Sequence, residues 1–359
     1  MPALLFVILL LWLALLPGAQ AVTLHVTLPT GAKVPIVSAM ALTTELSLTG
    51  QLRENTAGFA VPLTTDDSSV GLICPLSQLT LCLQQLPPAL RGQLPDIKAV
   101  RHLLGQRGAM ALLLLPESYA PSSSSPPADQ VQLTGVIVYQ HQQIAFELSS
   151  ILGASVYRLP LKSQPLLTLW HELGHLEVTR LQGQILPRQL SLYQHEALAD
   201  LFAAWRSLSL CSDASLAWQQ LHRRNLALIN DRDNISHWSG PVLHLLLQRG
   251  DIAHLAQLDS FADLLHELQL VSRRQPLTAG KMWEQGLPSQ PVLDEYNNLV
   301  QRLFGSGMMQ TLPGYLYWRR PALGQYLAPT FTALIGTHKA TTLLQGHRLI
   351  SSASEPDIR

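Results

Sequence analysis

Apolar and polar positions change their spacing along this chain, and the change predicts two halves of different secondary structure. From Thr23 to about Leu63, short β-branched stretches alternate with turn residues, which is typical of strands joined by tight turns. The stretch "TELSLTG" (44–50) is predicted to be one of these strands. After Gln164, apolar residues recur at helical spacing in one segment after another. This order favours an α+β fold, with a mixed sheet and helix half followed by a mainly helical half.

Between these stretches the pattern is mixed. It predicts helices over 77–86 and 94–108, the second ending on a Gly108 cap, and strands over 109–118, 131–140 and 154–160. Residues 120–128 ("APSSSSPPA") are too rich in proline and serine for a helix or a sheet, so they indicate a surface loop or a subdomain boundary.

The loop divides the chain into two expected regions after the N-terminal segment. Residues 22–120 form a β-rich or α+β region, which could be a pro-segment, an inhibitory lid or an integral subdomain. Residues 129–359 form a second region, with sheet strands over 129–160, two prominent helices over 164–206 and a helical C-terminal part.

Composition supports a folded protein without a nucleic-acid partner. Of the 359 residues 47% are hydrophobic, which is enough for a sizeable core. Lysine plus arginine equals aspartate plus glutamate at 24 each, and no basic block interrupts the chain. The electrostatic footprint expected of a nucleic-acid-binding surface is therefore missing.

The first 21 residues have the composition of an export signal. Ala3 to Leu16 is an unbroken apolar run, and Ala19-Gln20-Ala21 gives the small-x-small pattern of a processing site. The usual positive n-region is absent, so an uncleaved anchor is the alternative, although the run is short for a full span. We expect a periplasmic or secreted protein, with no stable membrane span after cleavage. Cys74 and Cys82 could pair in such a compartment.

One predicted helix carries two histidines in a spacing that suits a metal ion. In "LLTLWHELGHLEVTRL" (166–181), His171 and His175 lie four residues apart and project from one helix face. Glu172 is rotated about 100° from His171, which places its carboxylate beside the ion, where it can take a proton from water. A catalytic zinc normally has three protein ligands and an open fourth position, so one ligand is still required.

The next predicted helix offers that ligand. In "SLYQHEALADLFAAW" (191–205), Glu196 and Asp200 lie four residues apart on a face otherwise lined by small residues. Small residues allow a close approach to the first helix, which makes Glu196 a candidate third ligand. Asp200 could accept the second ring N–H of a ligand histidine. His195 points about 100° away and is expected to be an ordinary surface histidine.

HExxH followed about twenty residues later by ExxxD resembles the gluzincin family of zinc metallopeptidases. The match covers roughly residues 165–205. The resemblance implies a zincin-like fold, Zn²⁺ on His171, His175 and Glu196, Glu172 as general base and Asp200 as support for a ligand. It also implies an upstream sheet whose edge strand runs antiparallel to a bound peptide or protein substrate.

The sequence therefore favours an exported zinc metallopeptidase. The alternatives are a non-catalytic exported binding protein with a structural zinc, and a peptidase-like enzyme acting on something other than ordinary peptides. A peptidase also needs a donor for the oxyanion. Our first candidate is His237, which follows a loop-like stretch, and the other candidates are Arg232, His244, His254, Tyr157 and Tyr193.

Overall fold

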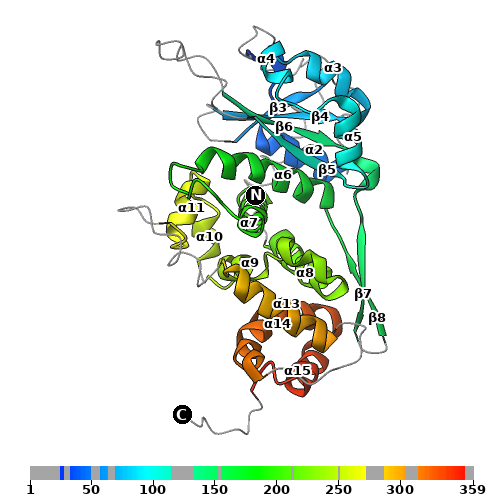
Figure 1. Cartoon of the computed structure of the whole chain (residues 1–359), viewed down its shortest axis with the longest axis vertical. Helices are drawn as coiled ribbons and strands as arrows, with labels where there is room; N and C mark the ends of the chain where they lie inside the picture. The colour runs from blue at the N-terminus through cyan, green and yellow to red at the C-terminus, as the bar shows by residue number, and fades with distance from the viewer. Residues whose placement is uncertain are drawn as a thin grey trace, which may run out of the picture.

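The computed structural model describes residues 25–27, 33–49, 57–63, 69–114, 132–152, 155–211, 214–249, 251–271, 287–304 and 314–351, and they adopt an α+β architecture (Figure 1). The strands are β1 (His25–Thr27), β2 (Lys33–Pro35), β3 (Phe59–Pro62), β4 (Ser69–Pro75), β5 (Ala109–Leu113), β6 (Gln132–Tyr139), β7 (Glu147–Leu152) and β8 (Ser155–Pro160). The expected signal segment 1–21 and the loop 120–128 lie outside the described residues.

Helices dominate the second half, as the apolar spacing predicts. The helices of the first half are α2 (Ala39–Thr49), α3 (Leu79–Gln84), α4 (Pro88–Arg91) and α5 (Ile97–Leu104). Those of the second half are α6 (Gln164–Leu181), α7 (Leu192–Cys211), α8 (Ser215–Asn230), α9 (Gly240–Leu247), α10 (Ile252–Leu255), α11 (Phe261–Glu267), α13 (Gln290–Phe304), α14 (Arg320–Ile335) and α15 (Thr337–Gly346). Short 3₁₀ segments include η4 (Arg232–His237), which leads into α9.

A four-stranded mixed sheet is the centre of the first half. Its strand order is β3-β4-β6-β5, with β4 and β6 parallel and the two outer pairs antiparallel. Strand β5 is therefore an edge strand. Because β5 precedes the loop 120–128 and β6 follows it, strands from both sides of that loop belong to one sheet.

Helices cover both faces of this sheet. In Figure 1, α3, α4 and α5 lie on one side of the strands and α2 and α6 on the other. Each side has its own apolar core, because alternate strand residues point to opposite faces. Leu72 and Val136 pack toward α3–α5, whereas Ile73 and Ile137 pack toward α6.

Two glycines allow α6 to lie directly on the sheet. Gly71 on β4 is paired with Gly135 on β6, and both face α6. A Cβ atom at Gly71 would approach Leu173 and Leu176 to 2.9 Å and 2.8 Å, and one at Gly135 would lie 2.5 Å from Leu176. Side chains at these positions would push the helix away from the strands, so the glycines fix its distance from the sheet.

A third glycine brings α7 against the other side of α6. A Cβ atom at Gly174 would lie 2.7 Å from the carbonyl oxygen of Ala199 and 2.9 Å from its Cα atom. Ala203, one turn further along α7, is also fully buried. The close contact between α6 and α7 follows from these small residues, as the sequence predicts.

Two sequence expectations about local structure were wrong. Residues 39–49 form a helix and not a strand, because Leu42 and Leu46, one turn apart, are both buried beneath the sheet. Helix α5 ends at Gly105, which has a positive φ of 54°, and not at Gly108. The predicted strand over 154–160 is confirmed as β8, which pairs with β7 in a separate two-stranded ribbon that packs against α8 and α14.

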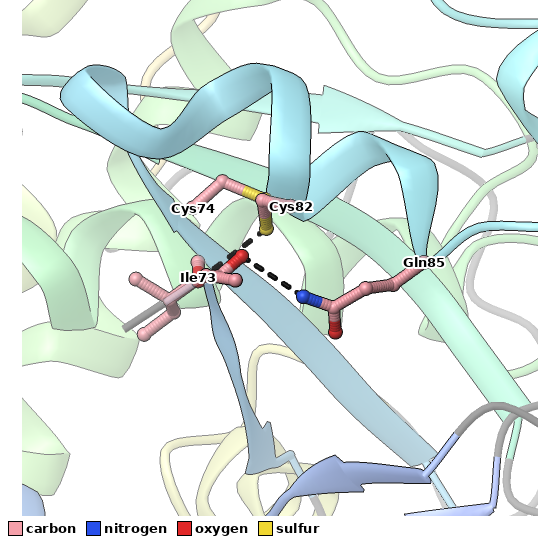
Figure 2. Close-up of a disulfide and its surroundings, with 5 residues drawn as sticks. Ile73, Cys74, Cys82 and Gln85 are labelled. Atoms are coloured by element: carbon pink, nitrogen blue, oxygen red, sulfur yellow. Dashed lines mark hydrogen bonds between the residues drawn. A yellow bond between two sulfur atoms is a disulfide. The ribbon is translucent and has the colours of Figure 1, made fainter. Parts of the chain in front are cut away.

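A disulfide joins Cys74 at the end of β4 to Cys82 on α3 (Figure 2). The bond closes a loop of eight residues on the sheet face opposite α6, and Cys82 Sγ lies 4.0 Å from the carbonyl oxygen of Ile73. Cys211 forms no disulfide with another described residue. In the part of the chain that the structure describes, no helix has the length and apolar character needed to cross a membrane.

Candidate metal centre

Helix α6 directs His171, Glu172 and His175 into one cavity at the edge strand β5. Its apolar residues, including Leu169, Trp170 and Leu173, are fully buried, which fixes the rotation of the helix about its axis. The two histidine side chains are only 12% and 13% exposed. Their Nε2 atoms are 3.1 Å apart, so both rings point at one place.

Glu196 on α7 completes a group of three possible metal ligands. Its Oε2 atom lies 3.2 Å from His171 Nε2, and its Oε1 atom lies 3.6 Å from His175 Nε2. Zinc bonds of about 2.0–2.1 Å in a tetrahedral arrangement require ligand atoms about 3.3–3.4 Å apart. The observed separations of 3.1 to 3.6 Å bracket this value, and Glu196 Oε2 is buried without a well-aligned hydrogen bond from the described residues.

Asp200 is a fully buried carboxylate that connects α6, α7, α8 and the start of α9. Its Oδ1 atom lies 2.7 Å from His171 Nδ1 and accepts hydrogen bonds from Gln220 Nε2 and from Arg224. Its Oδ2 atom accepts from Arg224 Nε at 2.6 Å and from Ser239 Oγ at 2.5 Å. Burial alone would raise the pKa of Asp200, but Arg224 and His171 hold it well below its usual range. The ionised carboxylate keeps the proton of His171 on Nδ1 and leaves Nε2 available as a ligand.

His175 is oriented by a second histidine, His195 on α7. The two Nδ1 atoms are 2.9 Å apart, and the ring centroids are 5.0 Å apart with an angle of 21° between the planes. Because the centroids are farther apart than the two nitrogens, the rings meet edge to edge. The expectation that His195 is an ordinary surface residue was wrong, because "HE" at the start of α7 places both side chains against α6.

The position of each proton in this pair follows from Thr179. The Thr179 hydroxyl donates its proton to the carbonyl oxygen of His175 at 2.9 Å. Toward His195 Nε2, which is 3.3 Å away, the hydroxyl oxygen of Thr179 can therefore only accept a hydrogen bond. Burial lowers the pKa of His195 and favours its neutral form. A neutral His195 that donates from Nε2 must accept at Nδ1, so the Nδ1 proton belongs to His175. The Nε2 lone pair of His175 then faces His171 and Glu196.

Burial and charge give the three candidate ligands different proton affinities. Burial disfavours the charged form of His171, but Asp200 and Glu196 outweigh it and raise its pKa to about 9. Burial and the neighbouring His171 lower the pKa of His175 to about 3. Burial would raise the pKa of Glu196, but His171, His175 and His237 lower it to about 2. His175 and Glu196 are therefore in their metal-binding forms at neutral pH, and only His171 has to release a proton.

Glu172 lies next to the three candidate ligands and is not one of them. Its carboxylate is buried and accepts a 2.7 Å hydrogen bond from the backbone N–H of Ala111 on β5. Burial raises its pKa, although His171 and the Ala111 N–H partly oppose the shift. A carboxylate that takes up protons more readily than usual suits the general acid and base role that the sequence predicts.

The side chains of His171, Glu172, His175, His195 and Glu196 line one open cavity of about 700 Å³ between β5 and the helices. His237, at the end of η4, also lines it, and its Nε2 atom lies 3.6 Å from Glu196 Oε1. The structure thus places our first oxyanion-donor candidate beside the ligands. The other donor candidates, all of them described residues, are not among those that line the cavity: Arg232, His244, His254, Tyr157 and Tyr193.

Sequence reasoning missed several residues of the centre. Thr179, Gln220, Arg224 and Ser239 surround the ligands and Asp200, and Arg223 lines the cavity. The "QQLHRR" pattern on α8 carries several polar residues within an otherwise apolar helix, which was the available signal, and the structure buries Gln220 and Arg224 of this pattern. Comparison with known proteins gives no relative, because no family model, curated protein or solved structure matches this chain.

Proposed function

We propose that this protein is an exported zinc-dependent peptidase with a zincin-like fold. The observation that supports the proposal most strongly is the meeting of His171, His175 and Glu196 around one point, with Glu172 beside them in an open cavity. Two imidazoles and a carboxylate are the donor set of a catalytic zinc site, and a bound zinc would lower the pKa of water and polarise the scissile carbonyl. A closed structural site would need a fourth ligand, and among the described residues this group has three.

Glu172 would move the protons of the reaction. With its raised pKa, the carboxylate can remove a proton from the attacking water and hold it until it is delivered to the leaving amine. Its hydrogen bond to the N–H of Ala111 fixes one oxygen, Oε2. The second oxygen is then the one available to the water.

His237 would donate a hydrogen bond to the oxyanion that forms on the scissile carbonyl. Burial lowers its pKa, so the ring is neutral near pH 7. Ser236 Oγ lies 3.1 Å from His237 Nδ1. When this hydroxyl donates to Nδ1, the ring proton is on Nε2, the atom that lies near Glu196.

The lining of the cavity suits a peptide in an extended conformation. Its lining includes Ala109, Met110, Ala111 and Leu113 of the edge strand β5. The unpaired backbone groups of an edge strand can bind a further strand, and peptides are often recognised in this way. A peptide segment paired with β5 would cross the cavity in front of Glu172.

The decisive variant is Glu172→Gln, tested on mixed fluorogenic peptides with zinc-loaded protein. The substitution keeps the hydrogen-bond acceptor for Ala111 but removes the proton carrier, so hydrolysis should fall by about 10²- to 10⁴-fold. The zinc content should remain that of the wild type, because Glu172 is not a ligand. If Glu172→Gln hydrolyses peptides as fast as the wild type, the proposed mechanism is wrong.

A further inference from the structure

Two adjacent arginines on α8 line the cavity, and among the described residues only one of them has a carboxylate partner. Arg224 forms a bidentate ion pair with Asp200, at 2.6 Å and 2.8 Å. The single hydrogen bond found for Arg223 runs from its Nε to Gln220 Oε1, at 3.3 Å. Among the described residues, no aspartate or glutamate forms an ion pair with Arg223.

Arg223 is half-buried and has no close counter-ion among the described residues. Burial is the main reason that the pKa of Arg223 falls to about 9, and repulsion by Arg224 adds to it. Asp200 and Glu196 act in the opposite direction from farther away, and both are already engaged with other groups. Arg223 remains charged at neutral pH, so its guanidinium lacks a close anion.

The Arg223 side chain is held by the same hydrogen-bond network that orients the ligands. Gln220 is buried, donates from Nε2 to Asp200 Oδ1 at 2.7 Å and accepts the Nε–H of Arg223. The side-chain stem is therefore anchored, and the two Nη groups have no hydrogen-bond partner among the described residues. A guanidinium presented in this way can bind a carboxylate through two parallel hydrogen bonds.

We infer that Arg223 binds a carboxylate of the peptide substrate, so that the cavity selects peptides with a negative charge close to the scissile bond. The inference rests on the proposed peptidase function. Arg223 on α8 and the edge strand β5 both line the cavity, so a substrate whose backbone pairs with β5 would have its side chains or terminus in the same cavity as the Arg223 guanidinium. The carboxylate can come from the C-terminus of the peptide or from an acidic side chain.

Calorimetric binding to the zinc-loaded Glu172→Gln protein tests this inference without turnover. The probes are acetylated alanine pentapeptides ending in a free carboxylate or an amide, and amidated ones carrying a glutamate or a glutamine in the middle. A bidentate charged contact predicts that at least one carboxylate peptide binds about 10- to 100-fold more tightly than its neutral partner. The pair that shows the difference identifies the source of the carboxylate.

Arg223→Gln, added to Glu172→Gln, should reduce this ratio to about one, because the charged donor is lost. Arg158→Gln is the matched control, since Arg158 is exposed on β8 with only a 3.8 Å pairing to Glu147, and it should keep the ratio. Two results would overturn the inference. One is equal affinity for the carboxylate and neutral peptides when Arg223 is present, and the other is a preference for the carboxylate peptide that persists in the Arg223→Gln protein. A carboxylate preference without hydrolysis by the wild type would refute only the peptidase function, and hydrolysis without the preference would refute only the role of Arg223.

Discussion

The Nδ1 atoms of His171 and His175 each face a partner, and this accounts for how the two rings are oriented. His171 Nδ1 faces Asp200, and His175 Nδ1 faces His195, which leaves both Nε2 atoms directed at one point. The sequence predicts the first partner, because ExxxD places Asp200 one turn beyond Glu196. It could not predict the second, because the direction of His195 depends on how α7 is rotated against α6.

Substitutions at His195 should change zinc affinity according to whether an acceptor remains. His195→Leu removes the acceptor for His175 Nδ1–H, and we expect zinc binding about 10- to 100-fold weaker. His195→Asn should restore most of the affinity, because the amide oxygen can accept the same proton. Competition with a chromogenic chelator measures both variants, and equal affinity in the leucine variant and the wild type would contradict the assigned hydrogen bond.

The candidate centre depends on a stack of three elements: the sheet, α6 and α7. Gly71 and Gly135 bring α6 onto the strands, and Gly174 brings α7 onto α6. Helices α6 and α7 could be predicted because each has a long apolar stripe interrupted by polar residues at regular spacing. Helix α2 was missed because its Thr residues favour strands in isolation, and burial of Leu42 and Leu46 overrides that preference.

Gly174→Ala should separate the two helices that hold the ligands. The added methyl group meets backbone atoms of Ala199, which cannot move alone, so we expect a loss of about 1–3 kcal/mol in the free energy of unfolding and weaker zinc binding. Gly346→Ala on α15 is the control, because a Cβ atom there meets nothing within 4 Å. Urea denaturation compares the two, and an equally stable Gly174→Ala protein would contradict the close packing.

At the scale of the whole molecule, the fold brings distant segments of the chain together around the cavity. Strand β5 supplies the N–H that binds Glu172, and η4 supplies His237, although 61 residues separate Ala111 from Glu172. The α+β class could be predicted from the order of apolar patterns. The strand order could not, because β5 pairs with β6 across the loop 120–128, and local periodicity does not report such pairing.

The disulfide lies on the sheet face opposite the candidate centre, so it should affect stability and not the metal. Replacing Cys74 and Cys82 together by alanine removes a cross-link over eight residues, which should cost about 2.5 kcal/mol in unfolding free energy. Zinc affinity should stay at the wild-type value. Denaturation under oxidising conditions tests the first expectation, and a loss of zinc binding in the double variant would contradict the separation of the two features.

The most direct test of the central claim is the zinc content of the purified protein with and without Glu196→Ala, determined by elemental analysis. We predict one zinc ion per chain in the wild type. In Glu196→Ala we predict a larger loss of zinc affinity than the roughly 10- to 100-fold loss expected when a residue that only hydrogen-bonds to a ligand is replaced. Glu147→Ala, on the exposed ribbon, should keep the zinc. A wild-type protein without zinc, or a Glu196→Ala protein that binds it equally well, would contradict the three-ligand centre.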